Sequence, residues 1–191
     1  MSTLVIVLRM ISLATFAAPM LLSDRAPVGE PTERAPRPVT DRMPLVANIA
    51  AFGLFFASLI FLSSSPAGSI ALPLALSGCT VALAGAALVL RSRAELGSAW
   101  SLLPKAGHDT GLVMTGPYRR VRHPIYLGLT LLASGNALSF GSSVTLLIVL
   151  VGIVPTFAWR ARAEEEELSR TFGEAFAVYR RRTKMIIPRL L

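Results

Sequence analysis

The chain has 191 residues, of which 53% are hydrophobic and only 16% are charged. This composition excludes an ordinary soluble domain and is typical of an integral membrane protein. The formal net charge of +8 points to membrane lipids as partners rather than nucleic acid, because the basic residues flank apolar segments and few aromatic residues lie among them.

Five apolar stretches follow in chain order, and about 20 residues are needed to span a bilayer as a helix. The stretches are residues 3–22, 44–62, 70–90, 125–140 and 144–159. The last two are short, at about 24 Å each by helical rise, and the turn at 141–143 joins them as a tight helical hairpin. The sequence therefore predicts an all-α integral membrane protein with five transmembrane helices, a cytoplasmic C-terminal helix and no Rossmann domain.

The first apolar stretch contains Arg9. An intramembrane arginine is a functional candidate, but we expect this one to snorkel from near a helix end to the interface. Cleavage of the stretch as a signal peptide is the alternative. The following loop, residues 23–43, is rich in Pro, Arg and Glu and is expected to be a mobile linker, so residues 1–94 would form N-terminal membrane helices with this loop.

The loops differ in charge, which predicts the orientation. Residues 63–69 and 141–143 carry no charge, whereas residues 91–124 carry six Lys or Arg and the tail from residue 160 carries eight. With five spans, every charged loop lies on one side, which the positive-inside rule makes cytoplasmic. Arginine outnumbers lysine 17 to 2, which favours a prokaryotic source. We expect a bacterial inner-membrane protein whose active site faces the cytoplasm.

Two polar clusters lie on the expected cytoplasmic side, and the first is "TGLVMTGPYRRVRHPIYLG", residues 110–128. Its glycines and prolines interrupt regular structure and free backbone groups for a ligand. Pro124 fits the first turn of the fourth helix and places His123 at the helix cap. A basic collar on lipid phosphates is the alternative, and it accounts for Arg119 and Arg120 better than for the histidine.

The second cluster is "RARAEEEELSRTFGEAFAVYRRR", residues 160–182, which continues the fifth helix. Arg162 and Glu166 are four residues apart and share a helix face. A solvated helix with an ion pair worth about 0.3 kcal/mol is the alternative reading. The chain has only two histidines and no H-E-x-x-H motif, so we expect no metal site.

Together the clusters resemble the isoprenylcysteine carboxyl methyltransferase family, which is related to the membrane phospholipid methyltransferases. The family pattern has Leu-Val, Gly-x-Tyr and Arg-His-Pro-x-Tyr-x-Gly, then a helical hairpin, an arginine, a run of glutamates and Phe-Gly. The matching positions here are 112–113, 116–118, 122–128, 162, 164–167 and 172–173. The resemblance covers about half of the chain, from residue 95 to residue 188.

The resemblance implies a methyltransferase core at residues 95–191 that binds S-adenosyl-L-methionine without a Rossmann fold. By the same resemblance, Arg162 would be the catalytic residue facing the substrate. The residues that would contact the cofactor are Thr110, Gly111, Leu112, Val113, Tyr118, His123, Pro124, Ile125, Tyr126 and Glu166. Which of the four consecutive glutamates faces the cofactor stays open.

We therefore predict an S-adenosylmethionine-dependent integral membrane methyltransferase with a lipid-like small-molecule acceptor. The sequence leaves open whether a carboxylate, a thiol or an amine is methylated. Two alternatives remain: an NADPH-dependent membrane reductase of the sterol-reductase type, and a non-catalytic lipid-binding membrane protein.

Overall fold

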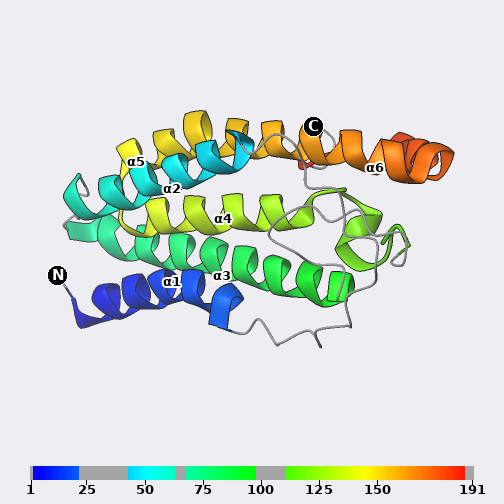
Figure 1. Cartoon of the computed structure of the whole chain (residues 1–191). Coiled ribbons are helices and arrows are strands. Elements are labelled where there is room, and N and C mark those ends of the chain that lie inside the picture. Colours follow the sequence, from blue (N-terminus) through cyan, green and yellow to red (C-terminus); the bar gives the residue numbers. More distant parts are fainter. Residues whose placement is uncertain (1, 22–42, 63–67, 98–110, 188–191) are drawn as a thin grey trace.

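A computed structural model of the chain describes residues 2–21, 43–62, 68–97 and 111–187. These residues form helices and no β-sheet (Figure 1). The helices are α1 (Thr3–Leu21), α2 (Met43–Phe61), α3 (Ala71–Leu96), α4 (Pro124–Ser139), α5 (Ser143–Ile148) and α6 (Val154–Arg182). Short 3-10 turns precede α3 and α4, at Gly68–Ile70 and Gly116–Arg119. The predicted linker at residues 23–43 lies outside the described residues apart from Met43.

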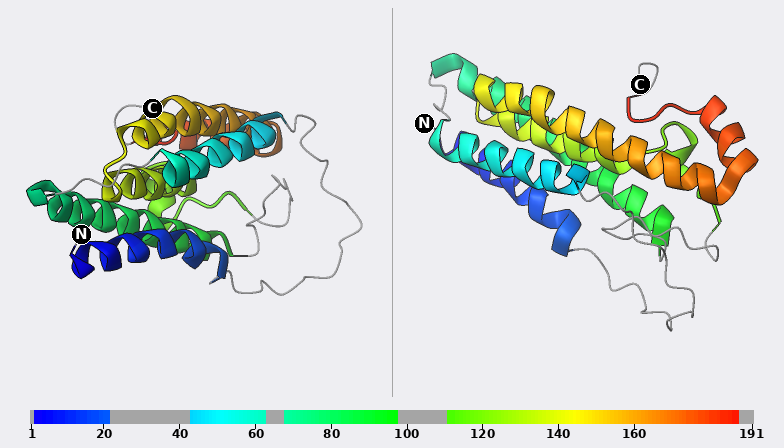
Figure 2. Two further views of the ribbon diagram at one scale, coloured as in Figure 1. Left: turned by 90° about the vertical axis from the view of Figure 1, so that its left-hand side faces the viewer. Right: turned by 45° about the horizontal axis from the view of Figure 1, so that its top comes forward.

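The helices are arranged in layers around the pair formed by α3 and α4 (Figures 1 and 2). Helix α1 packs on α3, while α2 packs against α5 and α6. Glycines allow the backbones of α3 and α4 to touch: a Cβ added to Gly78 would lie 2.2 Å from the Ser139 nitrogen, and one added to Gly85 would lie 2.5 Å from the Leu132 nitrogen. Small residues at such positions are typical of packed membrane helices.

Within the described residues, three helices are long and apolar enough to cross a membrane, namely Met43–Phe61, Gly68–Leu96 and Ser143–Arg182. Helix α1 contributes a shorter apolar helix, Thr3–Ala17, and α4 has only 16 residues. The all-helical architecture and the tight turn between α4 and α5 are confirmed. The count of five spans, their orientation and the division of the chain at residue 94 stay predictions.

The predicted fifth helix is longer and less regular than expected. Helix α5 continues through a π-helical turn, Val149–Ile153, into α6. The wider turn ends two residues before Pro155, which cannot donate a backbone hydrogen bond. Further along α6, Gly173 adopts φ 49° and ψ −121°, and the chain folds back there, as the right-hand view of Figure 2 shows.

The expectation that Arg9 snorkels to the interface is wrong. Its side chain is buried, and Nε donates a hydrogen bond to the carbonyl of Ser139 at 3.0 Å, with the guanidinium 5.5 Å from the centre of the Phe140 ring. Nearby, Ser12 donates to the side-chain oxygen of Asn136 at 3.1 Å. The last carbonyls of a helix lack partners within it and attract cations, so Arg9 stabilises the end of α4 and ties α1 to it.

Candidate functional site

The candidate site lies where the segment before α4 meets the segment after α6. Val121 and Lys184 form an isolated parallel bridge. The N–H groups of Arg122 and His123 donate to the carbonyls of Lys184 and Met185 at 2.8 and 2.9 Å. This pairing holds His123 as the residue before α4, where the sequence placed it.

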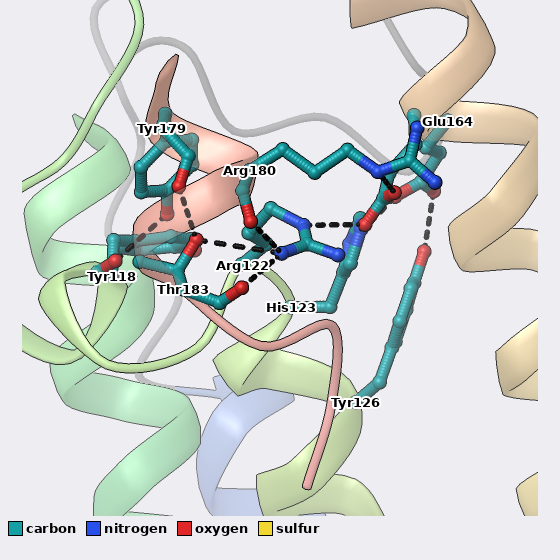
Figure 3. Close-up of polar contacts among 9 residues, drawn as sticks. Tyr118, Arg122, His123, Tyr126, Glu164, Tyr179, Arg180 and Thr183 are labelled. Atoms are coloured by element: carbon teal, nitrogen blue, oxygen red, sulfur yellow. Dashed lines mark hydrogen bonds and ion pairs between the residues drawn. The ribbon is translucent and has the colours of Figure 1, made fainter. Parts of the chain in front are cut away.

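His123 is buried between two carboxylates of α6 (Figure 3). Its Nδ1 lies 3.5 Å from Oε2 of Glu164, and its Nε2 lies 3.4 Å from Oε1 of Glu165. The Tyr126 hydroxyl donates a hydrogen bond to Glu164. The Nε2 atom is fully buried and, apart from its contact with Glu165, has no hydrogen-bond partner among the described residues.

Three arginines surround the two carboxylates. Arg122 Nε donates to Glu165 Oε1 at 2.6 Å, and Arg160 Nε donates to Glu164 Oε1 at 3.2 Å. Arg180 Nε lies 3.6 Å from Glu165 Oε2 (Figure 3). Because these cations outnumber the carboxylates, the cluster suits a ligand that carries an anionic group as well as a cationic one.

The carboxylates also change the protonation of the histidine. Burial alone lowers the pKa of His123, but the neighbouring carboxylates of Glu164 and Glu165 outweigh burial and raise the pKa above its usual value. Burial likewise favours the neutral form of Glu165, yet His123 and Arg122 hold the pKa of that carboxyl below its usual value. The two residues therefore stabilise each other's charged forms.

Aromatic rings form the apolar side of the cluster. The Tyr126 ring is stacked between His123, at a centroid distance of 5.5 Å, and Phe157, at 4.8 Å. The Arg160 guanidinium lies 5.8 Å from the centre of the Tyr126 ring. Phe157 in turn contacts Phe52 of α2 at 5.9 Å, so the polar cluster adjoins the apolar interior directly.

The structure brings together part of the residue set that the sequence predicts. His123 and Tyr126 meet in the cluster, and Tyr118 lies beside it with its carbonyl accepting from the Tyr179 hydroxyl at 2.7 Å. Pro124 is buried at the start of α4 and Ile125 is half-buried.

The remaining predicted residues lie elsewhere. Leu112 and Val113 are half-buried and Gly111 is exposed in the segment before α4. Arg162 and Glu166 are exposed on α6, outside the contacts described for the cluster. Thr110 lies outside the described residues.

Sequence reasoning did not single out Arg122 or Arg160. It named Glu166 while leaving open which of the four glutamates faces the cofactor, and the structure places Glu164 and Glu165 beside His123. One signal would have found Glu165. Phe157, Ala161 and Glu165 are each four residues apart and are all buried, so they occupy one face of α6. Because Phe157 and Ala161 are apolar and precede Glu165 at intervals of four residues, the sequence predicts that Glu165 faces the interior of the helix bundle with them.

The structure shows no metal centre in the part of the chain that it describes. No group of three or more His, Cys, Asp or Glu is placed there to hold a metal ion.

Comparison with known proteins finds a match to the phospholipid methyltransferase family model over residues 74–175. The protein-S-isoprenylcysteine O-methyltransferase of Schizosaccharomyces pombe is 33% identical over 84 residues, which are 44% of this chain and 36% of that protein. The nickel-cobalt-cadmium resistance protein NccN of Alcaligenes xylosoxydans xylosoxydans is 36% identical over 99 residues, 51% of this chain and 46% of that protein. The chain thus covers less than half the length of these relatives.

A solved structure shares the fold. The eukaryotic intramembrane Ras methyltransferase ICMT, an isoprenylcysteine carboxyl methyltransferase, matches with a TM-score of 0.60 and 20% sequence identity, over 95% of this chain and 63% of that one. The matched family region contains His123, Tyr126, Glu164 and Glu165 and spans more than half of the sequence. This chain belongs to the phospholipid methyltransferase family.

Proposed function

We propose that this protein is a membrane methyltransferase that uses S-adenosylmethionine to methylate a hydrophobic or lipid-like acceptor. The observation that carries the proposal is the buried cluster of His123, Glu164 and Glu165, which lies where the apolar helices meet the charged segments. A water-soluble donor and an oil-soluble acceptor can meet only at such a boundary. Membership of a methyltransferase family supports the same reaction class.

The described residues fit this cofactor. S-adenosylmethionine carries an ammonium, a carboxylate and a sulfonium, and the cluster offers both carboxylates and arginines. The side chains of Glu164 and Arg160 are partly exposed, so a ligand can reach a carboxylate and a guanidinium of the cluster directly. When bound, the cofactor supplies an activated methyl group on sulfur.

The chain's own part in the reaction is placement and exclusion of water. Glu164, Glu165 and His123 would orient the donor, and Tyr126 would hold Glu164 through its hydroxyl. The ring of Phe157 beneath Tyr126 keeps one side of the site apolar. In-line placement of reactants and a dry site account for much of the acceleration of such transfers.

The acceptor determines whether a base is needed. A carboxylate or thiolate attacks without one, whereas an amine must first lose a proton, which Glu164 could accept. Arg162 remains our candidate for orienting an anionic acceptor, since it is exposed two residues before Glu164. Arg160 is the second candidate because it contacts both Glu164 and the Tyr126 ring.

For the membrane arrangement, we propose five spans in a bacterial inner membrane, with the cluster on the cytoplasmic side. The one-sided charge of the loops supports this. Reporter fusions after residues 65 and 191 should report opposite sides of the membrane. Two fusions reporting the same side would refute the arrangement.

Calorimetric titration of the purified protein in neutral detergent tests the function itself. We expect S-adenosylhomocysteine, the demethylated form of the donor, to bind saturably and NADPH not to bind. Binding of NADPH alone would identify a reductase. Binding of neither compound would favour the lipid-binding alternative.

A further inference from the structure

A groove lies in the bend of α6, and one of its lining residues, Arg180, also lies 3.6 Å from Glu165 of the candidate site. Gly173, with φ 49°, divides the helix into two arms, and the second arm turns back along the first (Figure 2). The groove has a volume of about 410 Å³. It is lined by Ser169 of the first arm and by Phe176, Ala177, Arg180 and Arg181 of the second.

The lining combines two cations with an apolar wall. Arg180 and Arg181 are 64% and 65% exposed, and Phe176 is buried behind them. Each arginine has a carboxylate contact that an incoming anion can replace. Arg180 lies 3.6 Å from Glu165, beyond hydrogen-bond distance, and the Arg181–Glu174 pair at 2.9 Å is exposed. Exposed pairs contribute little, and guanidinium groups match the oxygens of a phosphate in pairs.

The groove lies at the level where α4 begins. The second arm ends at Arg182, and the carbonyl of the following residue, Thr183, accepts a hydrogen bond from Arg122. The next residue, Lys184, pairs with Val121, three residues before Pro124 starts the apolar run of α4. The bend at Gly173 therefore places Arg180 and Arg181, in the last turn of α6, at the level of the membrane boundary. The phosphates of lipid headgroups lie at that level.

We propose that this groove binds the phosphate of an anionic membrane lipid, with Arg180 and Arg181 on the phosphate oxygens and Ala177 and the methylene stems of the arginines along the apolar part of the headgroup region. The inference goes beyond the proposed methyl transfer, and the two share only Arg180, which lies between the groove and Glu165. A lipid, rather than soluble phosphate, is favoured because the half-buried Ala177 and the arginine stems adjoin the two cations at the boundary. Arginines on an evenly solvated helix would have neither apolar neighbours nor a fixed position at the membrane boundary.

The test compares lipid binding by the full chain in neutral detergent, measured as the shift of thermal unfolding with added phosphatidylglycerol or phosphatidylcholine. Phosphatidylglycerol should stabilise the parent saturably, and phosphatidylcholine should not. The double variant R180Q/R181Q should bind phosphatidylglycerol about 25-fold more weakly, at about fivefold for each arginine. The control is R170Q, which removes a 74% exposed cation of the same helix outside the groove lining. It should bind as the parent does.

A second variant tests whether lipid binding requires the space in the groove or only the positive charge of the two arginines. Ala177→Trp fills the groove and keeps both arginines, and it should weaken phosphatidylglycerol binding at least tenfold. Parent-like binding by Ala177→Trp, or equal losses in R170Q and R180Q/R181Q, would show a diffuse basic collar and overturn the proposal. Inorganic phosphate at matched concentration should not displace the lipid. If it does so with equal potency, the groove is a soluble-phosphate site and the lipid assignment is wrong.

Discussion

Arg122 and Glu165 are joined by an ion pair of 2.6 Å, although 43 positions separate them in the chain. The two side chains are only 8% and 7% exposed. Arg122 also donates to the carbonyl of Thr183, so one guanidinium connects the start of α4, the middle of α6 and the segment that follows α6. The pair thereby fixes the position of a carboxylate that contacts His123.

Replacing Arg122 by Ala should destabilise the protein by about 3 kcal/mol, because the buried carboxylate of Glu165 loses its nearest cation and keeps only His123 and Arg180 at 3.4 and 3.6 Å. Thermal unfolding in neutral detergent measures the loss. The double variant Arg122→Met with Glu165→Met should recover most of it, since neither charge is then left buried alone. Arg170→Ala, which removes an exposed pair, should change stability by about 0.5 kcal/mol or less. A loss in Arg122→Ala no larger than in Arg170→Ala would show that the pair is not buried.

Glu164→Gln and Glu165→Gln should each weaken S-adenosylhomocysteine binding about 10- to 150-fold, the range expected for a lost charge-assisted hydrogen bond of about 1.5–3 kcal/mol. Glu166→Gln should bind as the parent does, because Glu166 is exposed outside the cluster. Calorimetric titration of the three variants measures the difference. A larger loss of affinity in Glu166→Gln would support Glu166 as the cofactor-binding glutamate, as named from the sequence. Equal, negligible losses in all three variants would favour a solvated helix.

Arg162→Ala and Arg160→Ala should separate the two candidates for orienting the acceptor. If Arg162 binds the acceptor, its loss should leave S-adenosylhomocysteine affinity within about twofold and abolish acceptor turnover. Arg160→Ala should weaken cofactor affinity instead, because Arg160 contacts Glu164. Parallel cofactor titration and methyl-transfer assays measure both effects. Loss of turnover only in Arg160→Ala, with its cofactor affinity intact, would transfer the acceptor role to Arg160.

The raised pKa of His123 predicts how stability changes with pH. A group whose pKa is higher in the folded state contributes stability that is fully present below its unfolded pKa, about 6.5. That contribution is lost as pH rises through the folded pKa. Thermal unfolding of the parent should therefore occur at lower temperature as pH rises above about 6.5. The control His123→Gln should show a flatter profile, and parallel profiles for the two proteins would contradict the assignment.

Gly85→Leu should disrupt the pair formed by α3 and α4. Its Cβ would meet the Leu132 nitrogen at 2.5 Å and the Gly128 carbonyl at 2.6 Å, and backbone atoms cannot move aside singly. Overpacking costs about 1–3 kcal/mol or more, so thermal unfolding should occur at clearly lower temperature. Gly53→Ala is the matched control, because nothing lies within 4 Å of its added Cβ. It should be neutral or stabilising, since alanine favours helix.

The sequence by itself determined the helical class, the turn between α4 and α5 and the start of α4. These features follow from local rules: long apolar runs must form helices in a membrane, and proline fits a first helical turn. The same local rules placed His123 directly before α4 and Tyr126 within its first turn, where the structure has them.

Only the tertiary structure decided which charged residues meet. Four consecutive glutamates point in four directions around a helix, and the packing of α6 on its neighbours selects Glu164 and Glu165. Arg122 and Arg9 are buried because partners distant in the chain accept their hydrogen bonds. Their sequence neighbourhood does not specify those partners. Similarly, Gly173 allows a bend, but contacts such as that of Arg122 with Thr183 hold the returning arm against the site.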